Sequence, residues 1–246
     1  MLVLLIRAIA FHVIFVEIEK RAPTFLSSLI VTAKATLLNQ VYPTRVGSLL
    51  LIHEIKKKGS FSFPEATAMY GGSMVVSLLL TLTLGLAGGF IGTKLPHLIL
   101  TSLSIFIIIT LVTLFFGAKL LSGKLLTLWN EMTFFLNRPC GIPFIMLSAI
   151  ELIVMSFAIN HLYMSLGVTV GFEDAMALMS IRNFSLLLAL TPGAIGLSEI
   201  TVGHVSNLLN HGGAAGITVA LLLRVTLLGF SALLWFSEFA VKVLRR

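Results

Sequence analysis

The sequence has little charge and almost no cysteine. Of its 246 residues only 11% are charged, whereas 57% are hydrophobic, and the mean hydropathy is +1.04. These values exclude an ordinary soluble domain and place the chain among membrane proteins. Cys140 is the single cysteine, which excludes an intrachain disulfide and a thiolate metal cluster. No segment is polar enough for a separate soluble domain, so we expect one transmembrane domain over residues 1–246.

Motifs that mark a catalytic centre are also missing. The sequence contains no His-Glu-x-x-His, no Gly-x-Ser-x-Gly and no pair of carboxylates at catalytic spacing. Nothing marks a nucleophile, so we expect a protein that is not an enzyme and that uses no metal or cofactor. The net charge of +7 comes without a basic patch of interleaved aromatics. We therefore assign it to cytoplasmic loops and anionic lipid heads, and we expect no nucleic-acid partner.

What the sequence does have is a series of long apolar segments. A helix needs ~20 residues to cross ~30 Å of hydrocarbon. By this measure we predict membrane spans at residues 1–18, 66–86, 98–116, 142–163 and 214–236. The first segment lacks a basic start and a cleavage site, so we expect a retained helix and not a signal peptide. The fold class that follows is all-α, a polytopic membrane helix bundle.

Three shorter signals lie between these spans. Ser62-Phe63-Pro64-Glu65 predicts a helix start, because a capping serine precedes a proline and an acid in the first turn. Leu86–Pro96 is rich in glycine, and we expect a turn there. Over residues 117–137 apolar side chains fall on one helical face, which predicts an amphipathic helix lying on the membrane surface.

Two further apolar regions, about residues 24–58 and 175–209, are each interrupted by proline and glycine. The second contains Leu190–Glu199, in which Pro192, Gly193 and Gly196 precede the carboxylate of Glu199. Such a break leaves backbone groups unpaired, which hydrocarbon tolerates only inside protein or beside a water-filled cavity. We therefore interpret both regions as re-entrant hairpins. A tight loop between two ordinary membrane helices is the plainer alternative.

The placement of positive charge favours this topology. With the N-terminus outside and both broken regions re-entrant, eleven of the 17 lysines and arginines fall at cytoplasmic ends or loops and only Lys94 lies outside. If the hairpins were full crossings, Lys56, Lys57 and Lys58 would lie outside, against the positive-inside rule. The C-terminus is then cytoplasmic. Pro43-x-x-x-Gly47 and Pro192-x-x-x-Gly196 share a spacing, which suggests an inverted-topology repeat with its breaks near the midplane.

The breaks are candidate anion sites. A helix that begins inside the membrane points free amides and the positive end of its dipole at the cavity, and phosphate is a common occupant of such a site. Arg45 sits in the first break, and Glu199 follows the second, where it could pair with Arg45 or bind an amine or a proton. Structural pairing is the favoured reading for Arg7, Lys34, Glu151 and Arg224. The candidate substrate-binding residues are Arg45, Gly47, Pro192, Gly193, Gly196, Glu199, Lys34, Arg182 and Arg224.

Two motifs resemble those of a known family. Pro192-Gly193-x-x-Gly196-x-x-Glu199, followed by a last span with Arg224, resembles the signature of the lysylphosphatidylglycerol synthase transmembrane region, or flippase-like, family. Asn39-x-x-x-Pro43-x-Arg45-x-Gly47 resembles its first motif. The resemblance implies an integral protein of the cell membrane that moves an aminoacylated or glycosylated phospholipid, or a polyprenyl phosphate, between leaflets. It also implies two re-entrant hairpins in inverted orientation.

Two other functions stay open at this point. A membrane-embedded enzyme acting on lipid phosphates would also use re-entrant anion sites, but it needs an acid–base pair or a nucleophile. A non-transporting partner of a glycosyltransferase or lipid synthase could use residues 117–137 as its docking face. A homo-oligomer is open as well. The expected partner of the chain itself is an anionic or phosphate-bearing membrane lipid.

Overall fold

The computed structural model describes residues 1–18, 24–42, 46–59, 62–92, 133, 135–187 and 194–244. Over these residues every secondary-structure element is a helix and there is no strand, which confirms the all-α helix bundle. The helices are α1 (Leu2–Ile18), α2 (Phe25–Val41), α3 (Val46–Gly59), α4 (Phe63–Gly92), α7 (Gly141–Ser165), α8 (Phe172–Leu187), α9 (Leu197–Leu208) and α10 (Gly213–Leu244).

Three of these helices contain stretches long and apolar enough to cross a membrane, namely Phe63–Leu86 of α4, Gly141–Ser165 and Gly213–Glu238 of α10. They correspond to three of the predicted spans. The first predicted span is α1, an apolar helix of 17 residues. The predicted span at 98–116 and nearly all of the predicted surface helix at 117–137 lie outside the described residues.

The start of α4 forms as its sequence predicts. The backbone N–H of Ser62 donates to Oε2 of Glu65 at 2.8 Å, and the backbone N–H of Glu65 donates back to the Ser62 hydroxyl at 3.5 Å. Two amides at this end of the helix are thereby satisfied reciprocally. The carboxylate also lies at the positive end of the helix dipole, where it is favourable.

The far end of α4 corrects a prediction. Helix α4 continues to Gly92, so the residues 87–92 that were assigned to a glycine-rich turn are helical. The reason is packing against α8: a Cβ on Gly88 would lie 2.4 Å from the carbonyl oxygen of Glu173. Glycine at this position therefore lets two helices approach closely, and it does not end the helix.

Both predicted interruptions are present. Helix α2 ends at Val41 and α3 begins at Val46, and α8 ends at Leu187 and α9 begins at Leu197. At ~1.5 Å per residue the described residues of these four helices extend about 18–26 Å, less than the ~30 Å hydrocarbon core. Each pair packs together as a helical hairpin, which we call the first hairpin (α2–α3) and the second hairpin (α8–α9).

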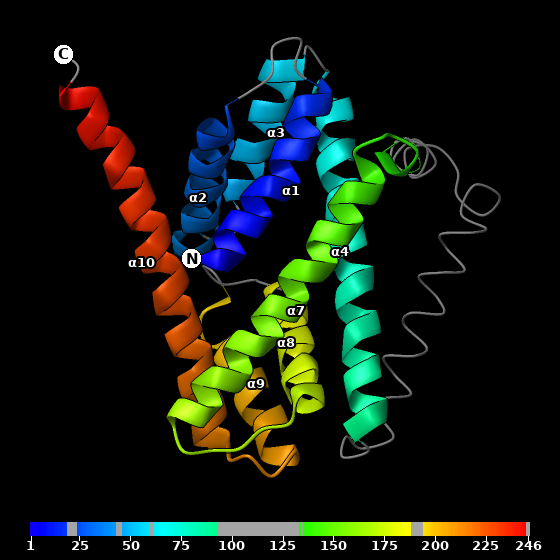
Figure 1. Ribbon diagram of the computed structural model, residues 1–246, viewed down its shortest axis with the longest axis vertical. Coiled ribbons are helices and arrows are strands. Elements are labelled where there is room, and N and C mark those ends of the chain that lie inside the picture. The colour runs from blue at the N-terminus through cyan, green and yellow to red at the C-terminus, as the bar shows by residue number, and fades with distance from the viewer. Residues whose placement is uncertain are drawn as a thin grey trace.

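The same two long helices flank both hairpins. The first hairpin contacts α10 through α2 and α4 through α3, whereas the second contacts α10 through α9 and α4 through α8. Figure 1 shows the first hairpin in the upper half of the molecule and the second in the lower half, with α7 running diagonally from the upper right to the lower left of the view. Helices α4 and α10, at about 45–48 Å, are long enough to reach from one hairpin to the other.

The apolar core has two parts that follow this division. One buried cluster joins α1 and the first hairpin to α4 and includes Phe11, Phe15 and Ile55. The other joins the second hairpin to α7 and α10. Leu80, near the middle of α4, packs against both clusters, so the two halves share a continuous core.

Candidate binding cavity and its charged neighbours

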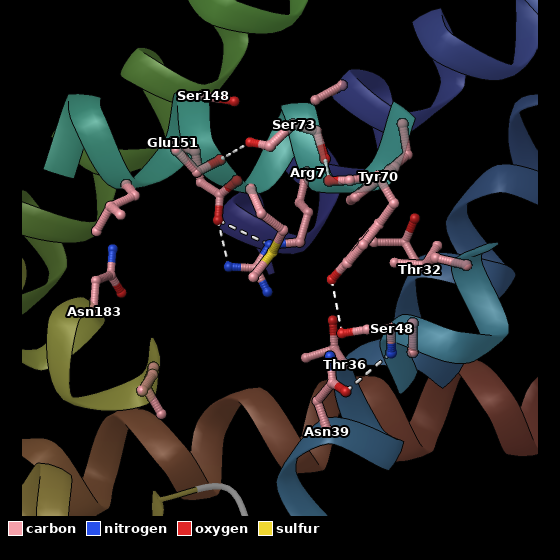
Figure 2. A pocket seen from close by; sticks show the side chains of 18 of the residues that line it. Arg7, Thr32, Thr36, Asn39, Ser48, Tyr70, Ser73, Ser148, Glu151 and Asn183 are labelled. Atoms are coloured by element: carbon pink, nitrogen blue, oxygen red, sulfur yellow. Dashed lines mark hydrogen bonds and ion pairs between the residues drawn. The ribbon is translucent and has the colours of Figure 1, made fainter. Parts of the chain in front are cut away.

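A polar cavity of about 230 Å³ lies between α1, α2, α3, α4, α7 and α8 (Figure 2). Its position on α7 is near the middle of that membrane helix, at Ser148 and Glu151. Hydroxyl groups, amides and one ion pair line it together with apolar side chains. The hydroxyl residues are Thr32, Thr36, Ser48, Tyr70, Ser73, Ser77, Thr81 and Ser148, and the amides are Asn39, Gln40 and Asn183.

The wall supplied by α4 is a row of hydrogen-bond acceptors. Ser73, Ser77 and Thr81 recur every four residues, so they share one face of the helix. Their hydroxyls donate at 2.7, 3.0 and 2.7 Å to carbonyls within their own helix. Since each proton is directed into the helix, the oxygen lone pairs are left for a ligand. This wall suits a ligand that brings hydroxyl or amine donors.

Helix α2 contributes acceptors that have no partner. Thr32, Thr36 and Gln40 also recur every four residues and line the cavity. Within the described part of the chain, the buried Thr32 hydroxyl and the buried Oε1 of Gln40 make no hydrogen bond. Buried polar atoms without partners are costly, and they are commonly satisfied by water or a ligand. Oε1 of Gln40 therefore calls for a donor from a bound molecule, whereas the Thr32 hydroxyl can accept from it or donate to it.

The start of α3 closes the cavity at the first hairpin. The backbone N–H of Ser48 donates to Oδ1 of Asn39 at 3.1 Å, and the hydroxyl of Tyr70 donates to that of Ser48 at 2.8 Å (Figure 2). A Cβ on Gly47 would lie 1.9 Å from the carbonyl oxygen of Ala35. Gly47 thus lets α3 start in contact with α2, and one amide of this start is already used within the hairpin.

The ion pair in the cavity joins α1 to α7. Nε of Arg7 donates to Oε1 of Glu151 at 2.9 Å, and Nη2 of Arg7 contacts the same oxygen (Figure 2). The structural pairing expected for these two residues is confirmed. The pair also lines the cavity, a role for which sequence reasoning had not selected either residue.

A second ion pair joins the start of α9 to α10. Nη1 of Arg224 lies 3.0 Å from Oε1 of Glu199, and both side chains are buried. Nη2 of Arg224 donates to the Ser198 hydroxyl at 3.1 Å, and the backbone N–H of Gly196 donates to Oε2 of Glu199 at 2.8 Å. The positive end of α9 therefore holds its own carboxylate. Gly196 begins this helix with a φ of 85°, a conformation that glycine adopts readily.

Arg182 of α8 lies near both ion pairs. Its side chain is 2% exposed and is close enough to Arg224, Arg7 and Glu199 for their charges to act on it. Nε of Arg182 has no hydrogen-bond partner, and among the described residues no carboxylate pairs with its guanidinium. Asn183 and Leu186, in the same stretch of α8, line the cavity. The guanidinium of Arg182 is therefore a buried cation beside the polar cavity.

The predicted site residues therefore separate into groups. Arg182, Glu199 and Arg224 come together, with Gly196 at the start of α9, and Gly47 lies at the start of α3. Lys34 is elsewhere, because it pairs with Glu238 of α10 and is not among the cavity-lining residues. Arg45, Pro192 and Gly193 lie outside the described residues.

Sequence reasoning missed the hydroxyl lining altogether. The signal was present as two polar rows at intervals of four residues, one in α4 and one in α2. A row of that kind inside an apolar helix predicts a polar interface, in the same way that an apolar row predicts a core face. What the rows could not reveal is that they face each other.

Comparisons with protein-family models, with curated proteins and with solved structures found no match for this chain.

Proposed function

We propose that this chain is an integral membrane lipid flippase or transporter that moves a phosphate-headgroup lipid between leaflets. The aminoacylated or glycosylated phospholipids and the polyprenyl phosphates form the proposed substrate class. The headgroup crosses through the polar cavity while the acyl tails stay in the surrounding lipid.

The polar cavity is the observation that carries this proposal. An ordinary helix bundle in hydrocarbon gains nothing from placing eight hydroxyls, three amides and an ion pair around one hollow. Ionisable residues at membrane depth mark substrate or ion pathways. Acceptors that lack donors, such as the Thr32 hydroxyl and Oε1 of Gln40, suit the hydroxyl or amine groups of a lipid headgroup.

The arrangement of the hairpins supports the same proposal. In the proposed topology the two hairpins are re-entrant, enter the cell membrane from opposite sides and form an inverted repeat around the cavity. The N-terminus is outside and the C-terminus is cytoplasmic. Transporters of this kind hold their substrates near the bilayer midplane, where the interrupted helices of the repeats meet.

The test fills the cavity and measures lipid movement. Purified chain is reconstituted into liposomes with a fluorescent phospholipid, and transbilayer movement is followed by quenching the outer leaflet. Thr81→Leu places an isobutyl group in the cavity, so we expect movement to fall to a small fraction of the unmodified rate. Thr83→Leu is the matched control, because Thr83 is exposed on another face of α4 and does not line the cavity. This variant keeps the full rate.

Two results would overturn the proposal. One is movement no faster with the chain than in empty liposomes for each lipid class named above. The other is equal loss of movement in both threonine variants. Release of inorganic phosphate from a lipid phosphate by the purified chain would instead favour the membrane-embedded enzyme.

A further inference from the structure

Five ionisable residues form a group that we call the charged belt: Arg7, Glu151, Arg182, Glu199 and Arg224. Two of its members are carboxylates, and each is held against one arginine. Arginine stays protonated in proteins. Three positive charges therefore face two negative ones, and the belt carries one excess positive charge located on Arg182.

The excess charge has nothing in the described part of the chain to balance it. Arg182 is 2% exposed, and its Nε makes no hydrogen bond. Lys34 cannot alter the balance, because its own partner is Glu238. A buried charge without a partner is far more costly than a buried ion pair. A single anionic group at this place would remove that cost.

We infer that the charged belt binds a phosphate group carrying a single negative charge, so that a phosphodiester headgroup is preferred over a phosphomonoester. This inference rests on the proposed function and narrows its substrate class. A phosphodiester brings one charge and leaves the belt neutral. A phosphomonoester has a second pKa near ~6, so above that pH it carries nearly two negative charges and leaves one of them buried and unbalanced.

Competitive lipid binding tests this directly. The full chain in detergent is mixed at pH 8 with equal amounts of phosphatidylglycerol, a phosphodiester, and phosphatidate, a phosphomonoester, both with the same acyl chains. Native mass spectrometry then measures the ratio of the two complexes. For the unmodified chain we expect the phosphatidylglycerol complex to be roughly tenfold or more as abundant as the phosphatidate complex. One charge-assisted hydrogen bond contributes a difference of this size.

Charge substitutions should change the ratio in opposite directions. Arg182→Gln makes the belt neutral, and we expect it to lose phosphatidylglycerol binding by roughly tenfold or more. Arg182→Lys keeps the charge and keeps the preference. Glu199→Gln raises the belt to two excess positive charges, so the preference shifts toward phosphatidate.

The ion pair between Lys34 and Glu238 supplies matched controls. Lys34→Gln and Glu238→Gln make the same changes in net charge, but outside the belt. Both variants should keep the preference of the unmodified chain. If these controls move the ratio as far as the belt variants do, or if Glu199→Gln does not shift it, the inference is wrong.

Failure of the inference differs from failure of the proposed function. Lipid movement without a preference between the two phosphates, in a chain that still folds, overturns the inference alone. A preference of the expected sign without any transbilayer movement overturns the proposed function and leaves a lipid-binding site. Binding of neither lipid above the level of the Arg182→Gln variant overturns the inference.

Discussion

The two hairpins begin their second helices in different ways. At the start of α3 a neutral amide, Asn39, accepts the backbone N–H of Ser48. At the start of α9 a carboxylate, Glu199, accepts the backbone N–H of Gly196 and pairs with Arg224. The second helix of the first hairpin therefore begins with uncharged groups, whereas that of the second hairpin begins with a fully buried ion pair to α10. The first hairpin has its ion pair to α10 elsewhere, between Lys34 and Glu238, and both side chains are partly exposed.

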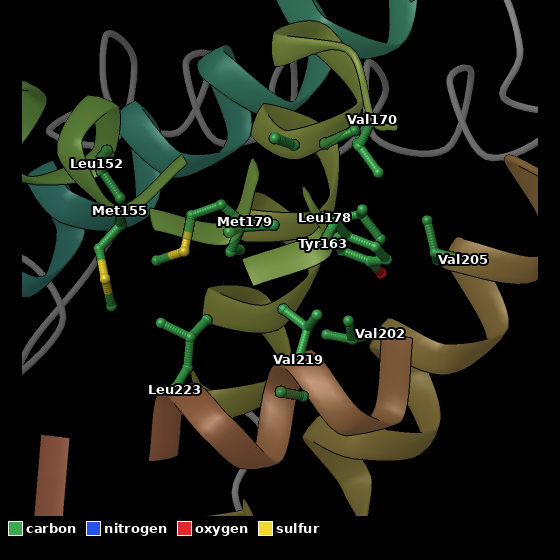
Figure 3. Packing of buried hydrophobic residues seen from close by; sticks show 14 of the residues in the cluster. Leu152, Met155, Tyr163, Val170, Leu178, Met179, Val202, Val205, Val219 and Leu223 are labelled. Carbon is green, nitrogen blue, oxygen red and sulfur yellow. The ribbon is translucent and has the colours of Figure 1, made fainter. Parts of the chain in front are cut away.

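The two hairpins also differ in how they are packed. The second hairpin is embedded in an apolar cluster with α7 and α10, in which Leu178, Val202 and Val219 pack together (Figure 3). Its outer end is closed by His211, whose Nε2 lies 2.7 Å from Oδ2 of Asp174. The first hairpin faces the cavity. We infer that the second hairpin is the stiffer one and that the first adapts to a ligand.

The largest effect should come from breaking the ion pair at the start of α9. Arg224→Met leaves Glu199 buried without its cation, and we expect a loss of about 3–5 kcal/mol in the free energy of unfolding. Arg138→Met is the control, because it breaks an ion pair whose side chains are both partly exposed. In that pair Nη1 of Arg138 lies 3.8 Å from Oε1 of Glu17. We expect it to cost about 1 kcal/mol or less. Thermal unfolding in detergent measures the loss of stability in both variants. Equal losses would contradict the claim that the ion pair at the start of α9 is specially strong.

The next largest effect concerns the close contact in the first hairpin. Gly47→Ala would place a Cβ 1.9 Å from the carbonyl oxygen of Ala35, so the helices must separate at a cost of about 1–3 kcal/mol or more. Gly71→Ala is the matched control, since a Cβ there meets nothing within 4 Å. In the interior of α4 that change should stabilise the chain by up to about 1 kcal/mol. The same unfolding measurement applies, and a neutral Gly47→Ala would show that α2 and α3 are not in contact there.

A smaller effect is expected from removing the uncharged hydrogen bond at the start of α3. Asn39→Ala removes the acceptor for the backbone N–H of Ser48, which should cost about 1 kcal/mol. The loss should be several times smaller than that of Arg224→Met. If Asn39→Ala costs as much as Arg224→Met, the start of α3 is no more adaptable than the start of α9.

The smallest effect is in the chemistry of Cys140, which reports on the core around the first hairpin. Burial raises the pKa of its thiol, and the nearby carboxylate of Glu17 raises it further. The folded chain therefore reacts slowly with maleimide at pH 8, and its rate rises with pH later than in unfolded chain. Gly47→Ala should accelerate labelling more than Arg224→Met does, because Cys140 packs in the cluster of the first hairpin. The reverse order would contradict the division into two halves.

Local signals were sufficient for much of the fold. Proline and glycine act on their own stretch of backbone, so the breaks between α2 and α3 and between α8 and α9 could be predicted from Pro43 and Pro192. Hydropathy is likewise a local sum, and it predicted the three membrane-length helices. The glycines near the end of α4 misled the prediction, because Gly88 serves a contact with α8 that its neighbours do not reveal.

The site depends on contacts between distant residues. Arg7 and Glu151 lie 144 positions apart, and nothing in either neighbourhood names its partner. The same is true of Glu199 and Arg224, since the sequence left open that Glu199 pairs with Arg45 instead. The rows of hydroxyls could be found from spacing alone, but a hydroxyl row shows which face is polar and not what lies opposite. A cavity is a property of several helices together.

Single-cysteine labelling of the sidedness of the two hairpins decides whether they enter from opposite leaflets. In a Cys140→Ser background, a cysteine is placed at Ser62, beyond the first hairpin, or at Gly212, beyond the second, and intact cells are treated with a membrane-impermeant maleimide. The proposed topology predicts labelling at position 212 from outside and at position 62 only after the membrane is opened. Labelling of both positions from the same side would contradict it.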